Sequence, residues 1–239
     1  QVFGHGWLLV GGEKMSKSKL TGIAPHQITD TFGSDAFRYY FMSAVNFGQD
    51  GSFSWEDLSA RYQSELANGF GNLASRVIAM ISRYFEDSVP GANEMNDADA
   101  VIVDTVAKAF QNANAAIDKL AIHDAIKSMW TIVDALNLYI TEQEPWVLAK
   151  DEANRARLNT VLYTAVEGLR AIAVGLSPIM PDATGKLWSA LGVGEALDLG
   201  LGLRVDRPDE REGGPGGLEG PQEVVDPVLR VGLLDRKST

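Results

Sequence analysis

The sequence predicts a mainly α-helical protein: an antiparallel α-helical bundle preceded by a small α/β segment. Two observations predict the bundle. Apolar residues recur at steps of three and four through most of residues 54–192, and the joints between these runs are short. A third observation predicts the α/β segment, because the apolar run 7–10 ends in two glycines, as a strand followed by a turn does. We expect three regions, at 1–53, 54–192 and 193–239.

The first region combines the strand with two short helices. Their expected ranges are 25–32 and 34–42, separated by Gly33. Ser34 or Asp35 is the expected N-cap of the second helix, because short polar side chains accept hydrogen bonds from the free amides of a first turn.

The second region begins with a long helix that reaches about residue 85. Ser54 and Asp57 have the spacing of a capping box at its start. Gly69 and Gly71 inside it cost about 1 kcal/mol each relative to alanine, so we expect them to allow close packing or a bend.

Five further helices are predicted, at 97–120, 122–141, 146–150, 155–175 and from 182 onward. Pro145 should end the second of these and enter the first turn of the next, while Asp182 should cap the last. The expected inner face of 97–120 comprises Val101, Thr105, Ala109, Ala113, Ala116, Ile117 and Leu120. The third region, 193–239, is rich in glycine and proline, and we expect it to be mostly disordered.

Composition limits the classes of function. The 239 residues carry a net charge of −11, with most of the excess acid after residue 85, which argues against non-specific nucleic-acid binding. The chain has no cysteine and three widely spaced histidines, so we expect no metal site and, in particular, no zinc site. No apolar run approaches the length of a membrane span, and we expect a cytoplasmic protein without a membrane partner.

The most informative motif is Lys14-Met15-Ser16-Lys17-Ser18, which lies between the pair Gly11-Gly12 and Gly22. Ammonium groups and hydroxyls on a glycine-flanked loop can follow negative charge as it develops on a leaving pyrophosphate. Charge alone would favour a solvated basic turn. The five-residue pattern, however, matches the KMSKS signature of class I aminoacyl-tRNA synthetases.

The surrounding segments resemble one family within that class, the methionyl-tRNA synthetases. The resemblance runs over roughly residues 2–192 and is carried by segments 33–40, 45–51, 68–76 and 142–146. It implies that residues 1–53 end a catalytic domain and that 54–192 bind the anticodon. It also implies an ATP-dependent ligase, using ATP with Mg²⁺, that joins methionine to tRNA(Met).

The resemblance assigns roles to residues of the motif. Lys17 would stabilise the transition state of amino-acid adenylation, and Lys14 would add positive charge, so both are candidate catalytic residues. Lys14, Ser16, Lys17 and Ser18 would contact the triphosphate of ATP.

A second group of residues would recognise the anticodon. Asn72 and Arg76 are four apart and therefore share one face of the long helix. With Pro145 and Trp146 they match the family's pocket for a CAU anticodon. From residue types alone, a surface arginine, a helix-interior asparagine and a buried core tryptophan are the alternative. Trp130 and Trp188 are expected in the core.

Catalysis by these 239 residues alone is not expected. Class I synthetases have another signature, of the His-Ile-Gly-His type, and no such motif occurs here. The enzyme would be active as a longer protein, of which this chain would be an inactive fragment. Two alternatives stay open: a non-catalytic RNA-binding helical module, and a truncated, non-functional gene product.

Overall fold

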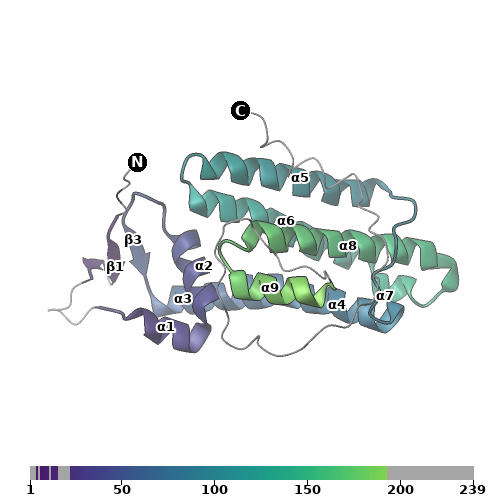
Figure 1. The fold of residues 1–239 in the computed structure, drawn as a ribbon, viewed down its shortest axis with the longest axis horizontal. Helices are drawn as coiled ribbons and strands as arrows, with labels where there is room; N and C mark the ends of the chain where they lie inside the picture. The colour runs from purple at the N-terminus through teal and green to yellow at the C-terminus, as the bar shows by residue number, and fades with distance from the viewer. Residues whose placement is uncertain (1–3, 5, 11, 16–21, 193–239) are drawn as a thin grey trace, which may run out of the picture. The chain divides into compact units, whose positions relative to one another are not determined.

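A computed structural model of the chain describes residues 4, 6–10, 12–15 and 22–192. All of these residues lie in the first of the two units into which the chain divides, Gln1–Leu197. The described part of the first unit is mainly helical, with a small sheet at one end, which confirms the predicted fold class (Figure 1). The predicted disorder of 193–239 falls outside the described residues.

Three short strands form the sheet, in the order β2-β1-β3. β1 (Leu8–Val10) pairs antiparallel with β2 (Glu13–Lys14) and parallel with β3 (Gly51–Phe53). The expected strand is therefore present. β3 was not predicted, since three residues are too few to show an alternating pattern. Two helices, α1 (Pro25–Phe32) and α2 (Ser34–Ala44), connect the parallel strands.

The start of α2 differs from the prediction. Gly33 is the N-cap, with φ of 84°, so the expectation of Ser34 or Asp35 at this position is wrong. A residue without a Cβ adopts this positive φ at little cost. Asp35 lies in the first turn, and its carboxylate accepts a hydrogen bond from the Ala183 N–H at 2.6 Å. It thus caps a different helix, α9 (Pro181–Ala190).

The start of α9 also differs from the prediction. The helix begins at Pro181, and Asp182 lies in its first turn instead of preceding it. Proline suits this place because its φ is already helical and its missing N–H would have had no partner. The Asp182 carboxylate accepts a hydrogen bond from the Ser34 hydroxyl at 3.3 Å. Two hydrogen bonds therefore connect the first turn of α2 with the first turn of α9.

The long helix is continuous but not uniform. It consists of α3 (Trp55–Arg61), the π-helical segment η1 (Tyr62–Gly71) and α4 (Asn72–Phe85). The Ser54 side chain accepts from the Asp57 N–H at 3.0 Å, as predicted. The Asp57 carboxylate accepts from Tyr40 and Arg61, so the reciprocal half of the capping box is replaced by contacts to neighbouring side chains.

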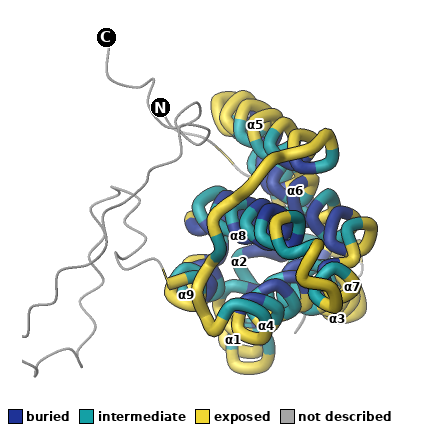
Figure 2. The backbone as a smooth tube through the Cα atoms, turned by 90° about the vertical axis from the view of Figure 1, so that its right-hand side faces the viewer, coloured by how far each residue is buried: buried dark blue, intermediate teal, exposed yellow. Residues whose placement is uncertain are grey.

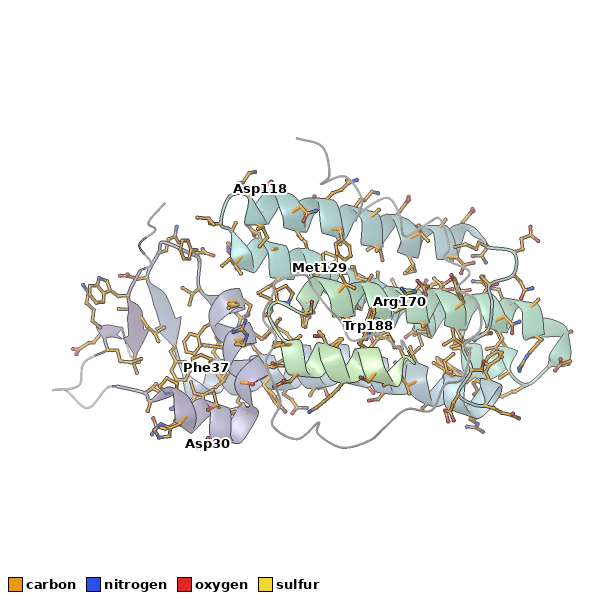
Figure 3. All side chains as sticks on the ribbon, in the orientation of Figure 1. Asp30, Phe37, Asp118, Met129, Arg170 and Trp188 are labelled. Atoms are coloured by element: carbon orange, nitrogen blue, oxygen red, sulfur yellow. The ribbon has the colours of Figure 1, made fainter. Side chains whose placement is uncertain are left out.

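Four helices complete the bundle with α4 and α9. They are α5 (Asp97–Ile117), α6 (Ile122–Gln143), the short α7 (Pro145–Leu148) and α8 (Arg155–Leu176), the last preceded by a 3₁₀ turn, η2 (Glu152–Asn154). α8 is enclosed by the other helices and buries residues on most of its surface (Figure 2). Side chains such as Met129 of α6 fill the space between helices (Figure 3).

The predicted inner face of α5 is confirmed at Ala109 and Ala116, which are buried, but it is wrong at its two ends. Val101 and Ile117 are 59% and 50% exposed, and Ile102 is buried in place of Val101. Two adjacent apolar residues leave open which of them faces the core. A polar group settles the choice here: Asp99 is fully buried, and it lies on the same face as Ile102.

Asp99 is held by a polar cluster that joins α5, α6 and α8. It accepts hydrogen bonds from Tyr139 and from two nitrogens of Arg157, at 2.5 and 2.9 Å for the latter. Burial alone would raise the pKa of Asp99, but these donors and the Arg157 charge lower the pKa below its usual value. Arg157 also donates to Gln143 at 2.6 Å, close to the end of α6.

Candidate functional site

The predicted site residues fall into two groups. Within the unit of residues 1–197, β1 and α7 lie at opposite ends (Figure 1). The KMSKS motif follows β1 at one end, and the residues matched to an anticodon pocket lie on α4 and α7 near the other. We treat these groups as two sites.

Arg76 and Trp146 are brought together although 70 positions separate them. The Arg76 guanidinium carbon lies 5.9 Å from the centre of the Trp146 ring, within the range of a cation–π contact. Trp146 is 38% exposed. Its ring therefore offers an accessible surface, which the alternative of a buried core tryptophan does not allow.

The turn before α7 fixes the position of Trp146. α6 ends at Gln143, and Glu144 adopts a left-handed conformation with φ of 44°. Pro145 then occupies the first turn of α7, as predicted, and is buried. Because proline anchors the start of this short helix, the adjacent Trp146 projects toward α4 while part of its ring stays exposed.

Asn72 opens α4 one turn before Arg76 and is exposed. Its backbone N–H donates to the Ala67 carbonyl five residues back, which closes the last π turn. An exposed amide, a guanidinium and an aromatic ring thus lie on two adjoining helices. Such groups can hydrogen-bond to base edges and stack on an unpaired base.

Trp130 of α6 and Trp188 of α9 differ from Trp146. Trp130 stacks on Tyr39 with ring centres 4.8 Å apart, and Trp188 packs against Arg170 at 5.8 Å (Figure 3). Both are partly buried and pack against the main core. The prediction that they belong to the core is confirmed, although neither is fully enclosed.

At the sheet end, the structure describes the start of the KMSKS motif. Lys14 lies in β2, and its ammonium group lies 4.4 Å from the centre of the Trp7 ring. Met15 continues the pairing, with its N–H donating to the Leu8 carbonyl at 3.2 Å. Ser16, Lys17 and Ser18 lie outside the described residues.

A shallow, mostly apolar cavity of about 270 Å³ lies beside β1. Residues of β1, of α2 and of the loop 45–49 form its walls, with Ile122 from the start of α6. Asp50 supports this region, since its carboxylate accepts the Trp7 N–H at 2.6 Å. The cavity is therefore lined by Trp7, whose ring contacts the Lys14 ammonium group.

Among the described residues there is neither a cluster of metal ligands nor a membrane-spanning helix. No three acidic or histidine side chains among them come together as metal ligands would. None of their helices is both long and apolar enough to cross a membrane.

Two residues at these sites were not foreseen from the sequence. The Trp7 ring contacts the Lys14 ammonium group across two segments that pair in the sheet. A prediction that 13–14 pairs with 7–10 could have suggested this contact. Asn137 of α6 donates to the carbonyl of Gly69 at 3.2 Å. No local pattern marks this contact, because it joins segments 68 residues apart.

Comparisons with known proteins agree with this structure. Residues 1–78 match a family model described as class I (M) tRNA synthetases, and 89–198 match the anticodon-binding domain of methionyl tRNA ligase. A methionine–tRNA ligase of Streptomyces coelicolor is 54% identical over 200 residues, which cover 82% of this chain and 37% of the relative. One of Caldanaerobacter subterraneus is 43% identical over 87% of this chain and 34% of its own length.

A solved structure gives the same result for the fold. Mycobacterium tuberculosis methionyl-tRNA synthetase, in complex with methionyl-adenylate, superposes with a TM-score of 0.74 at 36% identity. The match covers 79% of this chain and 40% of that one. The chain thus spans between a third and two fifths of the length of these relatives.

Proposed function

Since residues 1–198 belong to the methionyl-tRNA synthetase family, we propose that the chain is part of a methionine–tRNA ligase. Such an enzyme uses ATP to join methionine to tRNA(Met). In this proposal the chain supplies the KMSKS loop and the helical bundle that binds the anticodon, with a boundary near residue 53. An enzyme of protein synthesis belongs in the cytoplasm, where we expect this one to act.

The observation that carries the proposal is the contact between Arg76 and Trp146. The two residues lie on separate helices, yet they form one partly exposed surface together with Asn72. In our proposal Trp146 stacks on an anticodon base, while Arg76 and Asn72 hydrogen-bond to base edges or phosphate. Pro145 would hold Trp146 in place.

The KMSKS loop would act on ATP. We propose that Lys17 stabilises the charge on the leaving pyrophosphate and that Lys14, Ser16 and Ser18 contact the triphosphate. Mg²⁺ would accompany the nucleotide, held mainly by groups outside this chain. The Trp7 contact holds the Lys14 ammonium group at the sheet end, where this loop begins.

Two tryptophan variants test the anticodon assignment. The parent chain should bind an RNA hairpin with a CAU loop more tightly than one with a changed anticodon. Trp146→Ala should erase much of this preference, because a base-stacking ring is worth roughly 1–3 kcal/mol. Hairpin titration by fluorescence anisotropy, at one fixed salt concentration, measures the preference.

Trp130→Ala is the matched control, because it removes a ring that packs on Tyr39 in the core. A large-to-small change of this kind costs about 3–5 kcal/mol, so this variant should melt early. If instead Trp146→Ala melts early and the parent shows no anticodon preference, Trp146 is a structural residue and the assignment fails.

A further inference from the structure

The π-helical segment η1 separates two parts of one helix that serve different hydrophobic clusters. In α3, Leu58 packs with Ile28, Tyr40 and Phe53 beside the sheet. In α4, Leu73, Val77 and Ile81 face the main core of the bundle. The one long helix therefore contributes to two cores, which need not lie in the same direction from its axis.

A π turn changes the direction in which later side chains point. Its hydrogen bonds span five residues instead of four, so each π turn holds nearly one residue more than an α turn. One added residue rotates everything after it by about 100° around the axis. The direction of Arg76 and Asn72 is thus set by η1 as well as by their own helix.

Two glycines fit the π geometry. A Cβ added to Gly71 would lie 3.1 Å from the Leu66 carbonyl oxygen, and one added to Gly69 would lie 3.3 Å from that of Ser64. In both cases the close atom belongs to the residue five positions back, which a π turn brings near. Glycine therefore occupies the two positions of the segment at which a side chain would be crowded by a carbonyl oxygen.

Asn137 of α6 holds the end of the π segment. Near this end the hydrogen bonds of the helix change from five-residue to four-residue spacing. At this end, the Asn137 amide donates to the Gly69 carbonyl at 3.2 Å, while also donating to Val133 of its own helix at 3.0 Å. It is half-buried, so it supplies a donor where access of water is restricted.

We propose that η1, held by Asn137, sets the rotation of α4 that places Arg76 over Trp146, and that Asn137 is a positioning residue for RNA binding. The role of Asn137 in RNA binding rests on the proposed function. The observations that carry the inference are the Asn137–Gly69 hydrogen bond, the close carbonyls at two glycines, and the π bond that ends at Asn72.

An experiment without RNA tests the positioning. The chain has five tryptophans, so ¹⁵N-indole spectra of the full chain contain few signals, and Trp146→Phe identifies that of Trp146. In the parent, Arg76→Ala should move this signal. In the Asn137→Leu background the same change should move it much less, because α4 has turned. An undiminished response in that background, or no response in the parent, overturns the inference.

Three further variants distinguish positioning from general loss of structure. Asn137→Gln keeps an amide donor and should restore part of the response. Asn159→Leu removes another half-buried helix amide, which donates to Asn93 away from α4, and should leave the response intact. Gly71→Ala should lower the melting temperature although alanine favours an ordinary helix; a rise would contradict the crowded π turn.

RNA binding then tests the functional part. Asn137→Leu should lose roughly tenfold of the preference for the CAU hairpin, and Asn159→Leu should keep it. A full preference in Asn137→Leu overturns its role in RNA binding. If the parent itself shows no preference, the proposed function fails, and the indole response alone decides whether η1 positions Arg76.

Discussion

The bundle end and the sheet end of the unit differ in how many apolar side chains they bury. The bundle encloses one large core, with residues such as Leu136, Leu162 and Ile172 fully buried. The sheet has strands of two or three residues and a cluster of only four buried side chains. Trp7, at 62% exposure, lies in the open beside it.

This difference indicates where each function can be measured. A bundle with its own core should keep its surface in this chain, so anticodon binding is testable here. Three short strands bury little, and exposed aromatic residues often mark surfaces that meet another part of a protein. The relatives are two to three times longer. We therefore expect the chemistry of the KMSKS loop to need such a longer polypeptide.

The largest effect should come from an arginine in the bundle. Arg157→Ala would leave the Asp99 carboxylate fully buried without its ion pair, which costs about 3–5 kcal/mol. Urea unfolding of the parent and the variant measures this loss. The matched control near the sheet is Arg61→Ala, because Arg61 forms two surface pairs, with Asp57 and Glu65.

Surface pairs contribute about 0–1 kcal/mol, so the control should stay close to the parent. Equal losses for the two variants would mean that the bundle does not depend on its buried polar cluster more than the sheet end depends on its surface pairs.

The next effect concerns catalysis at the sheet end. In a full-length ligase carrying this sequence, Lys17→Ala should slow adenylation on the order of 100-fold, since one electrostatic donor is worth ~3 kcal/mol. Single-turnover formation of methionyl-adenylate measures the rate. Lys19→Ala is the control, because Lys19 follows the motif and should have little effect.

In a pyrophosphate-exchange assay, the 239-residue chain alone should give no methionine-dependent exchange. Exchange by this chain would show that the two ends are less different than we argue, and an unchanged rate in Lys17→Ala would remove that lysine from the mechanism.

The smallest effects should appear in the pH dependence of two aspartates, with opposite signs. The pKa of Asp99 is lowered, so its contribution to stability is present above about pH 3.9, the usual pKa of the unfolded state, and is lost on further acidification. Burial raises the pKa of Asp35, in spite of hydrogen bonds from Ala183 and Asp182. Its contribution is therefore full below about pH 3.9 and is lost as the pH rises through the folded value.

Urea unfolding of Asp99→Asn and Asp35→Asn from pH 3 to pH 7 checks these signs. The parent should lose its advantage over Asp99→Asn on acidification. Asp35→Asn should instead gain on the parent as the pH rises, because the amide carries no charge to bury and still offers an acceptor to the Ala183 N–H. The same sign for both variants would contradict the comparison.

Sequence patterns predicted the elements with strong periodicity. The helices of the bundle, the proline at the start of α7 and the pairing of Asn72 with Arg76 on one face all depend on local spacing. The contact of Arg76 with Trp146 came from a family resemblance, since no local pattern joins positions 70 residues apart.

The errors have a common physical cause. The burial of Ile102 instead of Val101 in α5, the caps of α2 and α9, and the π segment all depend on partners distant in sequence. Asp99 needs Arg157, Asp35 needs Ala183, and Gly69 needs Asn137. Local propensity is a weak guide wherever such a tertiary contact decides between nearly equal choices.

The contacts between α2 and α9 bear on how the chain is made. Asp35 and Ala183 are 148 positions apart, and Arg38 donates to the Ile179 carbonyl 141 positions later. At roughly 5–20 residues per second, a ribosome needs roughly 7–30 s between these segments. For that time the nascent sheet end would have no α9 to dock on, with its aromatic residues accessible. The order of synthesis thus makes α9 the helix that completes these contacts, and it makes the early segment a natural client for chaperones.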